Sequence, residues 1–124
     1  MYKLFLILGS ISGGLAVSIG AFGAHALKNM LTSTGRLETF ETAVKYQFYH
    51  ALALILLGIL MLNFKHEMFN YAGYSFICGS IIFSGSLYAL CISGITKFGI
   101  ITPIGGLFLI AGWVLLLVGI LKTT

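Results

Sequence analysis

The segment IITPIGGLFLIAGWVLLLVGIL, residues 100–121, contains no Asp, Glu, Lys or Arg in 22 consecutive residues. A helix of that length rises about 33 Å, which is enough to cross the roughly 30 Å hydrocarbon core of a bilayer. Inside that core every backbone N–H and C=O group must find a partner within the protein, which a helix provides. The segment therefore predicts one membrane-spanning helix.

Three further segments, residues 4–24, 46–64 and 71–90, are also free of these charged residues. The chain is 59% hydrophobic and only 8% charged, whereas a soluble domain usually has about 25% charged residues. A membrane β-barrel would show alternating segments of about ten residues, which this sequence lacks. We therefore expect an all-α integral membrane protein that forms one domain over residues 1–124, with helices at about 4–27, 38–64, 70–93 and 100–121.

The connections between these helices are short, except for one longer polar segment, residues 25–45. Short connections join antiparallel neighbours, so we expect a four-helix up-down bundle with both termini on one side, and an amphipathic segment leading into the second helix. The seven cations divide three against four between the two sides, which leaves the membrane orientation open. Because the cations are scattered, we expect the lipid bilayer as a partner and not nucleic acid.

Small residues are informative here, because apolar side chains gain nothing by leaving lipid and helices associate through close backbone approach. The first predicted helix carries two stripes of small residues, so we expect it at the centre of the bundle. The third and fourth helices carry small residues at intervals of seven, a period that keeps a stripe facing its partner. We expect helix contacts at Gly14, Gly20, Gly79, Ser86, Gly105, Gly112 and Gly119.

The segment RLETFETAVKYQFYH, residues 36–50, holds most of the ionisable and amide side chains of the chain. On one helix Glu41 precedes Lys45 by four residues, the favourable order for an ion pair at the water boundary. His50 lies at membrane depth, where an ionisable side chain faces the bundle interior and needs a partner. A structural role predicts a neutral imidazole bonded to a serine or a backbone carbonyl, while a proton-handling or ligand role is the alternative.

His25 ends the first predicted helix on the same side of the membrane as this segment. The last carbonyls of one helix and the first N–H groups of the next lack intrahelical partners. We expect Glu38, Glu41, Gln47 and His25 to fill these vacancies, with Glu41 or Gln47 bonded to His25 or to the exposed carbonyls of the first helix. His25→Leu should then lower thermal stability more than His66→Ala, because His66 has the sequence context of a solvated turn.

Several kinds of chemistry have no support in the sequence. It contains no aspartate, no phosphate-binding glycine loop and no nucleophile–base arrangement, so we do not expect an ordinary hydrolase or nucleotide-using enzyme, nor a metal site. Paired histidines on adjacent helices can hold haem, but His25 lies at the helix mouth and His50 deeper, so we expect no haem or quinone. Cys78 and Cys91 would stand about 20 Å apart on one helix, too far for a disulfide.

Two hypotheses for the function remain. The first is a non-enzymatic helix bundle that works by assembling with itself or with a larger membrane complex, because one monomer cannot bury every stripe of small residues. The second is a channel or carrier for a proton or a small solute, which would use the polar cluster of His25, Glu41, Lys45 and His50.

Four motifs resemble, in order and across essentially the whole chain, the small bacterial membrane family filed as domain of unknown function 423, which also has eukaryotic relatives. They are GAFGAHALK at 20–28, FETAVKYQFYHALAL at 40–54, FSGSLY at 83–88 and TPIGG at 102–106. The resemblance implies a four-span protein of the bacterial plasma membrane. It brings no catalytic or binding residues with it.

Overall fold

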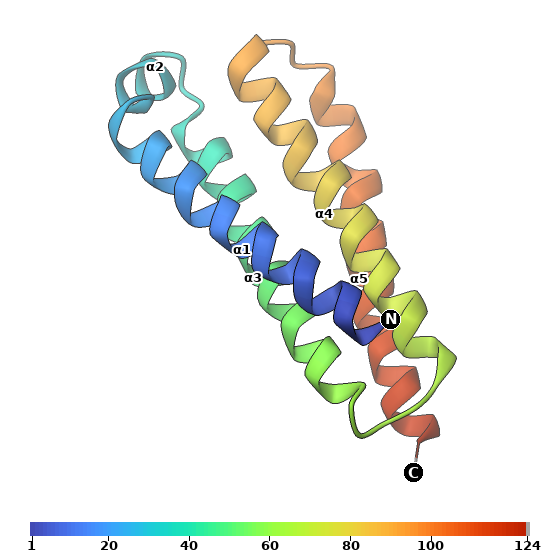
Figure 1. Cartoon of the computed structure of the whole chain (residues 1–124). Coiled ribbons are helices and arrows are strands. Elements are labelled where there is room, and N and C mark those ends of the chain that lie inside the picture. Colours follow the sequence, from blue (N-terminus) through green and yellow to red (C-terminus); the bar gives the residue numbers. More distant parts are fainter. Residues whose placement is uncertain (124) are drawn as a thin grey trace.

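The computed structural model describes residues 1–123, and within them the chain forms five helices and no strand (Figure 1). Four of the five are long and apolar enough to cross a membrane. The prediction of an all-α protein with four membrane-spanning helices is therefore confirmed. The helices are α1 (Tyr2–His25), α2 (Lys28–Ser33), α3 (Leu37–Leu60), α4 (Glu67–Ser93) and α5 (Phe98–Lys122).

The polar segment before the second spanning helix differs from the prediction in one respect. Part of it folds into the short helix α2, whose Leu31 is fully buried. The amphipathic segment leading into the membrane is the start of α3, which exposes Glu38 and Glu41 and buries Phe40 and Ala43. The membrane helix thus begins as a surface helix with one apolar side.

The four long helices pack in a chain of neighbours. α1 lies against α3, α3 against α4, and α4 against α5, while α2 lies beside α1 and α3. Figure 1 shows the long helices running alternately up and down, with both termini at the end opposite α2. This is the predicted up-down order.

The prediction that the first helix lies at the centre of the bundle is wrong. α3 and α4 each contain nine buried residues, whereas α1 and α5 each contain four. Only one of the two small-residue stripes of α1 faces α3: Gly9 and Gly23 are buried there, while Ser10 and Gly14 of the other stripe are exposed. A stripe of small residues permits close approach, but it does not require that the partner belong to the same chain.

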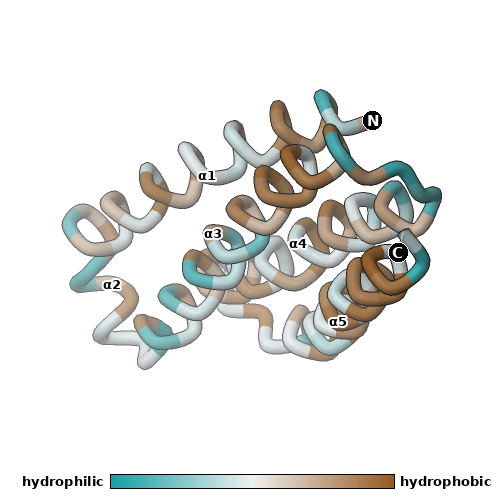
Figure 2. Tube along the Cα trace, turned by 90° about the horizontal axis from the view of Figure 1, so that it is seen from below, coloured by the Kyte–Doolittle hydropathy of each residue, from teal (hydrophilic) through white to brown (hydrophobic). Residues whose placement is uncertain are grey.

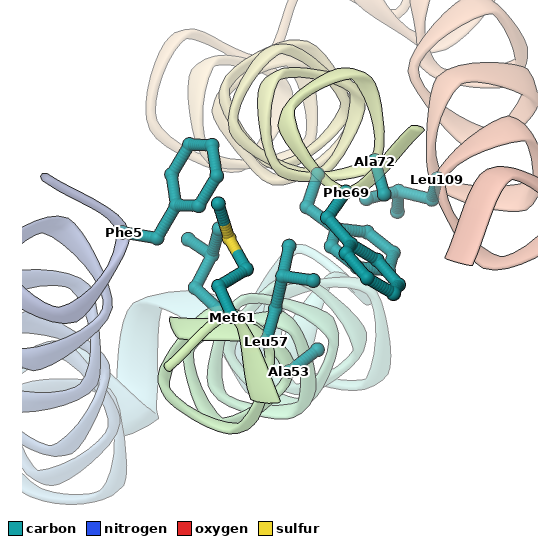
Figure 3. Packing of buried hydrophobic residues seen from close by; sticks show 9 residues of the cluster. Phe5, Ala53, Leu57, Met61, Phe69, Ala72 and Leu109 are labelled. Carbon is teal, nitrogen blue, oxygen red and sulfur yellow. The ribbon is translucent and has the colours of Figure 1, made fainter. Parts of the chain in front are cut away.

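The larger hydrophobic cluster lies toward the end of the bundle that carries the termini, and a smaller one, formed by Leu31, Phe40 and Cys91, lies beside α2. Figure 3 shows side chains from the long helices converging in the larger cluster, with Phe5 from α1, Leu57 from α3, Phe69 from α4 and Leu109 from α5. Phe5 is fully buried, and a Cβ at Gly73 of α4 would lie 2.2 Å from its ring. The glycine therefore provides the space that lets this ring dock on α4.

Hydropathy along the chain agrees with a membrane location. Figure 2 shows hydrophilic residues concentrated at the turns and helix ends, while α5 is hydrophobic over most of its length and α1 is paler. The pale colour of α1 reflects its many glycines, serines and alanines. The two outer helices therefore present different surfaces to the bilayer.

Candidate functional site

His50 is a buried ionisable side chain in the middle of α3, with 5% of its surface exposed. Its Nδ1 lies 2.8 Å from the carbonyl oxygen of Tyr46, and its Nε2 lies 3.0 Å from the indole Nε1 of Trp113 on α5. A carbonyl can only accept and an indole N–H can only donate. These partners therefore assign the proton to Nδ1 and leave the ring neutral.

Aromatic rings surround this imidazole. The His50 ring centroid lies 5.5 Å from that of Phe76 on α4 and 5.8 Å from that of Trp113. Tyr46, one turn before His50, lies 6.3 Å away in a stacked arrangement and also contacts Phe83 of α4. The cluster joins α3, α4 and α5 at a hollow of about 350 Å³ that opens between α3 and α5.

This arrangement suits a structural role for His50. Both ring nitrogens already have partners, so the imidazole can accept a proton or bind a ligand at Nε2 only after the bond from Trp113 breaks. Breaking that bond would leave the buried Nε2 of His50 without a donor and the indole N–H of Trp113 without an acceptor in the middle of a membrane-spanning helix, which is costly. The surroundings therefore favour a fixed link between α3 and α5.

Gln47 makes a second polar link, this time toward α1 and α4. Its Nε2 donates to the carbonyl of Ser12 at 3.0 Å, and its Oε1 accepts from the Tyr88 hydroxyl at 2.6 Å. The side chain is 8% exposed. One amide thus connects three helices, which suits a buried group that must satisfy both its donor and its acceptor.

Two further hydrogen bonds between helices involve serine hydroxyls. Ser84 of α4 donates to the carbonyl of Ala43 on α3 at 2.8 Å, and Ser86 of α4 bonds to the Thr102 hydroxyl of α5 at 2.5 Å. Hydrogen bonds between membrane helices contribute about 0.6 kcal/mol on average. Their greater value here is that they fix the register between neighbouring helices.

Sequence reasoning selected Gln47 and His50 but missed their partners Trp113 and Tyr88. Trp113 did carry a signal, because tryptophan is enriched at the membrane surface, yet this one is the sixteenth of the 25 residues of α5. An indole N–H at that depth needs an acceptor. No feature of α5 alone shows that the acceptor is His50.

The other members of the predicted polar cluster lie on the outside. The side chains of His25, Glu38, Glu41 and Lys45 are exposed and make no hydrogen bond or ion pair within residues 1–123. The expected ion pair between Glu41 and Lys45 is therefore not formed. Such a pair is worth only about 0.3–0.5 kcal/mol at an exposed site, too little to hold both side chains in one position.

The expected junction between the first two spanning helices is also different. Gln47 does reach α1, but at Ser12 in mid-helix and not at the terminal carbonyls. The end of α1 is closed by backbone bonds, because Ala26 and Leu27 both donate to the carbonyl of Phe22. The chain then continues into α2, so few vacancies are left for side chains to fill.

The predicted contact glycines of the third and fourth spanning helices lie between α4 and α5. A Cβ at Gly79 would lie 2.7 Å from Leu109, and one at Gly105 only 2.4 Å from the backbone nitrogen of Phe83. Gly112 and Gly119 meet phenylalanine rings of α4 at 2.6 and 2.7 Å. These positions admit no side chain at the present helix spacing.

The two contact glycines expected on the first helix have different environments. A Cβ at Gly20 would lie 3.2 Å from Val44 of α3, within the α1·α3 contact. Gly14 is exposed, and nothing lies within 4 Å of a Cβ built there. Within one chain, therefore, Gly14 touches no other helix.

Comparison with known proteins identifies the chain's relatives. The family described as "Protein of unknown function (DUF423)" matches residues 19–106. A UPF0382 membrane protein of Staphylococcus haemolyticus is 44% identical over 120 residues, covering 97% of each chain. The UPF0382 membrane protein YwdK of Bacillus subtilis is 39% identical, covering 97% of this chain and 98% of its own.

The UPF0382 inner membrane protein YgdD of Escherichia coli K12 is 35% identical, covering 97% of this chain and 91% of its own. No solved structure matches the chain. The relatives' names and the four spanning helices agree on a multi-pass membrane protein, as expected from the sequence. The chain therefore belongs to the DUF423 family of UPF0382 membrane proteins, the family that its four motifs resemble.

Proposed function

We propose that this protein is a non-enzymatic helix bundle that acts by assembling in the bacterial plasma membrane, with a second copy of itself or within a larger membrane complex. The observation that carries the proposal is the α1 outer stripe, which consists of Ser10, Gly14 and Ser18. These residues recur at four-residue intervals and are all exposed. Within residues 1–123, nothing lies within 4 Å of a Cβ built at Gly14.

The α1 outer stripe has the properties of a contact between membrane helices. Small residues spaced by four let two backbones approach closely, and in lipid this approach drives association. The hydroxyls of Ser10 and Ser18 bond to carbonyls of their own helix, Leu6 at 2.8 Å and Gly14 at 2.9 Å. The stripe is therefore a row of small residues whose hydroxyls already have hydrogen-bond partners.

A row of large side chains runs beside the α1 outer stripe. Ile11, Leu15 and Phe22 are 52–60% exposed and lie next to the stripe on the helical wheel at about 100° per residue. A row of large side chains beside a row of small ones is self-complementary, since the large residues of one copy can pack over the small residues of another. This favours a second copy as the first partner to test.

The alternative function, a conduit or carrier for a proton or small solute, has less support. It requires ionisable groups along a connected path, but His25, Glu41 and Lys45 lie on the outside and His50 has both nitrogens engaged. The same geometry is unsuited to haem held between His25 and His50. We therefore expect purified protein to be colourless, with no Soret absorption.

The oligomeric state in lipid tests the proposal. Single-molecule counting in vesicles of increasing protein density should find oligomers of the wild type, and Gly14→Leu should convert them to monomers. The matched control is Gly85→Leu on α4, because Gly85 is also exposed with nothing within 4 Å of a Cβ. The proposal is overturned if the wild type stays monomeric at every density and also retains no partner protein when purified from native membranes, or if the two variants have equal effects.

A further inference from the structure

A groove runs along the outside of the contact between α1 and α3. Its inner section, of about 280 Å³, is lined by Val17, Gly20 and Ala21 from α1 and by Lys45, Phe48 and Tyr49 from α3. Small residues form one wall and large side chains the other. Apart from the Lys45 ammonium and the Tyr49 hydroxyl, the lining side chains are apolar, which suits an acyl chain.

The groove continues toward the membrane surface. A second section of about 160 Å³ shares Gly20 and Lys45 with the first and extends to Glu41 and Leu37 at the start of α3. Lys45 therefore stands midway along the groove. Glu41 lies one turn nearer the surface, about 6 Å along the helix axis.

Both charges in this α1–α3 groove are unpaired. Lys45 and Glu41 are exposed, and neither makes an ion pair within residues 1–123. Lys45 is the ninth residue of the 24-residue helix α3 and directly precedes the uncharged segment 46–64, so it lies at the edge of the apolar span. Helical side chains point toward the N-terminal end, so Lys45 extends toward the headgroup region. Hydrocarbon chains alone would offer neither charge a favourable interaction.

The order of chemistry along the groove matches one class of molecule. From the membrane interior outward the groove presents an apolar section, then a cation, then an anion. An ethanolamine phospholipid presents the complementary order of acyl chain, phosphate and primary ammonium. A lipid with a glycerol headgroup lacks the ammonium, and a choline lipid replaces its N–H donors with methyl groups.

We propose that the α1–α3 groove is a binding site for one ethanolamine phospholipid. The acyl chain lies along Val17 and Phe48, the phosphate accepts from Lys45, and the ammonium donates to Glu41. The site shares no residue with the α1 outer stripe, so separate variants test lipid binding and assembly.

Native mass spectrometry of the delipidated full-length protein tests the site with three added lipids that share the same acyl chains: phosphatidylethanolamine, phosphatidylglycerol and phosphatidylcholine. The wild type should bind one phosphatidylethanolamine in preference to the other two. Lys45→Gln should weaken binding of every lipid about fivefold. Glu41→Gln should remove the preference for phosphatidylethanolamine over phosphatidylglycerol while keeping phosphate binding.

The matched control is Lys97→Gln, which removes an exposed lysine on the same side of the membrane but outside the groove. It should leave lipid binding unchanged, and thermal melting of each variant confirms that it remains folded. Equal binding of the three lipids by the wild type, equal losses in the Lys45 and Lys97 variants, or a second protein copy displacing the lipid would each overturn the proposal.

Discussion

α1 and α5 are the two outer helices of the bundle, and they expose different kinds of side chains to the bilayer. Each uses a glycine-rich inner face to dock on a central helix, α1 on α3 and α5 on α4. On its outer side α5 exposes only large residues between positions 104 and 121, the smallest of them Val114. α1 instead exposes Ser10, Gly14 and Ser18.

The difference matters because a large aliphatic side chain gains nothing by exchanging a lipid neighbour for another helix. The outer side of α5 is satisfied by acyl chains, which fill the spaces between its side chains. A stripe of small residues offers more to a second helix than to lipid, since helix backbones approach closely there. The inner faces therefore build the monomer, and of the two outer helices α1 is the one that retains an exposed stripe of small residues, on which the proposed assembly rests.

The largest expected effect separates an inner face from an outer one. Gly105→Ala on α5 should destabilise the protein by about 3 kcal/mol, because its Cβ would lie 2.4 Å from the backbone of Phe83 and the helices must move apart. Gly14→Ala on α1 should change stability by less than about 0.5 kcal/mol. Reversible unfolding in lipid–detergent mixtures measures both. Similar losses would show that Gly14 is buried in the monomer.

A smaller effect tests the polar link that ties α5 to the centre. Trp113→Phe keeps an aromatic ring but removes the donor to His50, so it should cost about 2 kcal/mol by leaving Nε2 buried and unpaired. Tyr49→Phe is the control, because the exposed Tyr49 hydroxyl makes no hydrogen bond within residues 1–123. If both variants melt at the wild-type temperature, the link does not hold α5 in place.

The smallest expected effect concerns two histidines at helix ends, and it reverses the expectation from sequence. His66 is the N-cap of α4, with its Nδ1 accepting from the backbone N–H of Met68 at 3.1 Å. His66→Ala should therefore cost about 1 kcal/mol. The His25 side chain at the end of α1 is exposed and makes no hydrogen bond within residues 1–123, so His25→Leu should cost less than about 0.5 kcal/mol. If a thermal melt shows a larger loss of stability for His25→Leu than for His66→Ala, the order expected from the sequence is correct instead.

The four membrane-spanning helices could be predicted from the sequence because the bilayer fixes the length of a span and excludes charged residues from it. Both properties can be read from one segment alone. The sequence was not sufficient for α2, since six residues carry no periodic signal and Leu31 is held by packing against Phe40 and Cys91. The glycines of α5 marked a contact face because they repeat along one helix.

The candidate site could be predicted only in part, for a related reason. Gln47 and His50 could be selected as polar groups at membrane depth, but their partners depend on the register between helices. Similarly, two small-residue stripes on α1 indicated two neighbours without showing that only one lies in the same chain. Pairing between helices is a tertiary property that no single span encodes.

Cysteine crosslinking in the native membrane tests the difference between α1 and α5 most directly. In a Cys78→Ala background, which removes the exposed native cysteine, single cysteines replace Ser10, Gly14 or Ser18 on α1 and Leu107, Val114 or Leu117 on α5. A disulfide requires Cα atoms within about 7 Å, so oxidation should give covalent dimers for the α1 series and none for the α5 series. Dimers from the α5 series alone, or from neither series, would contradict the account.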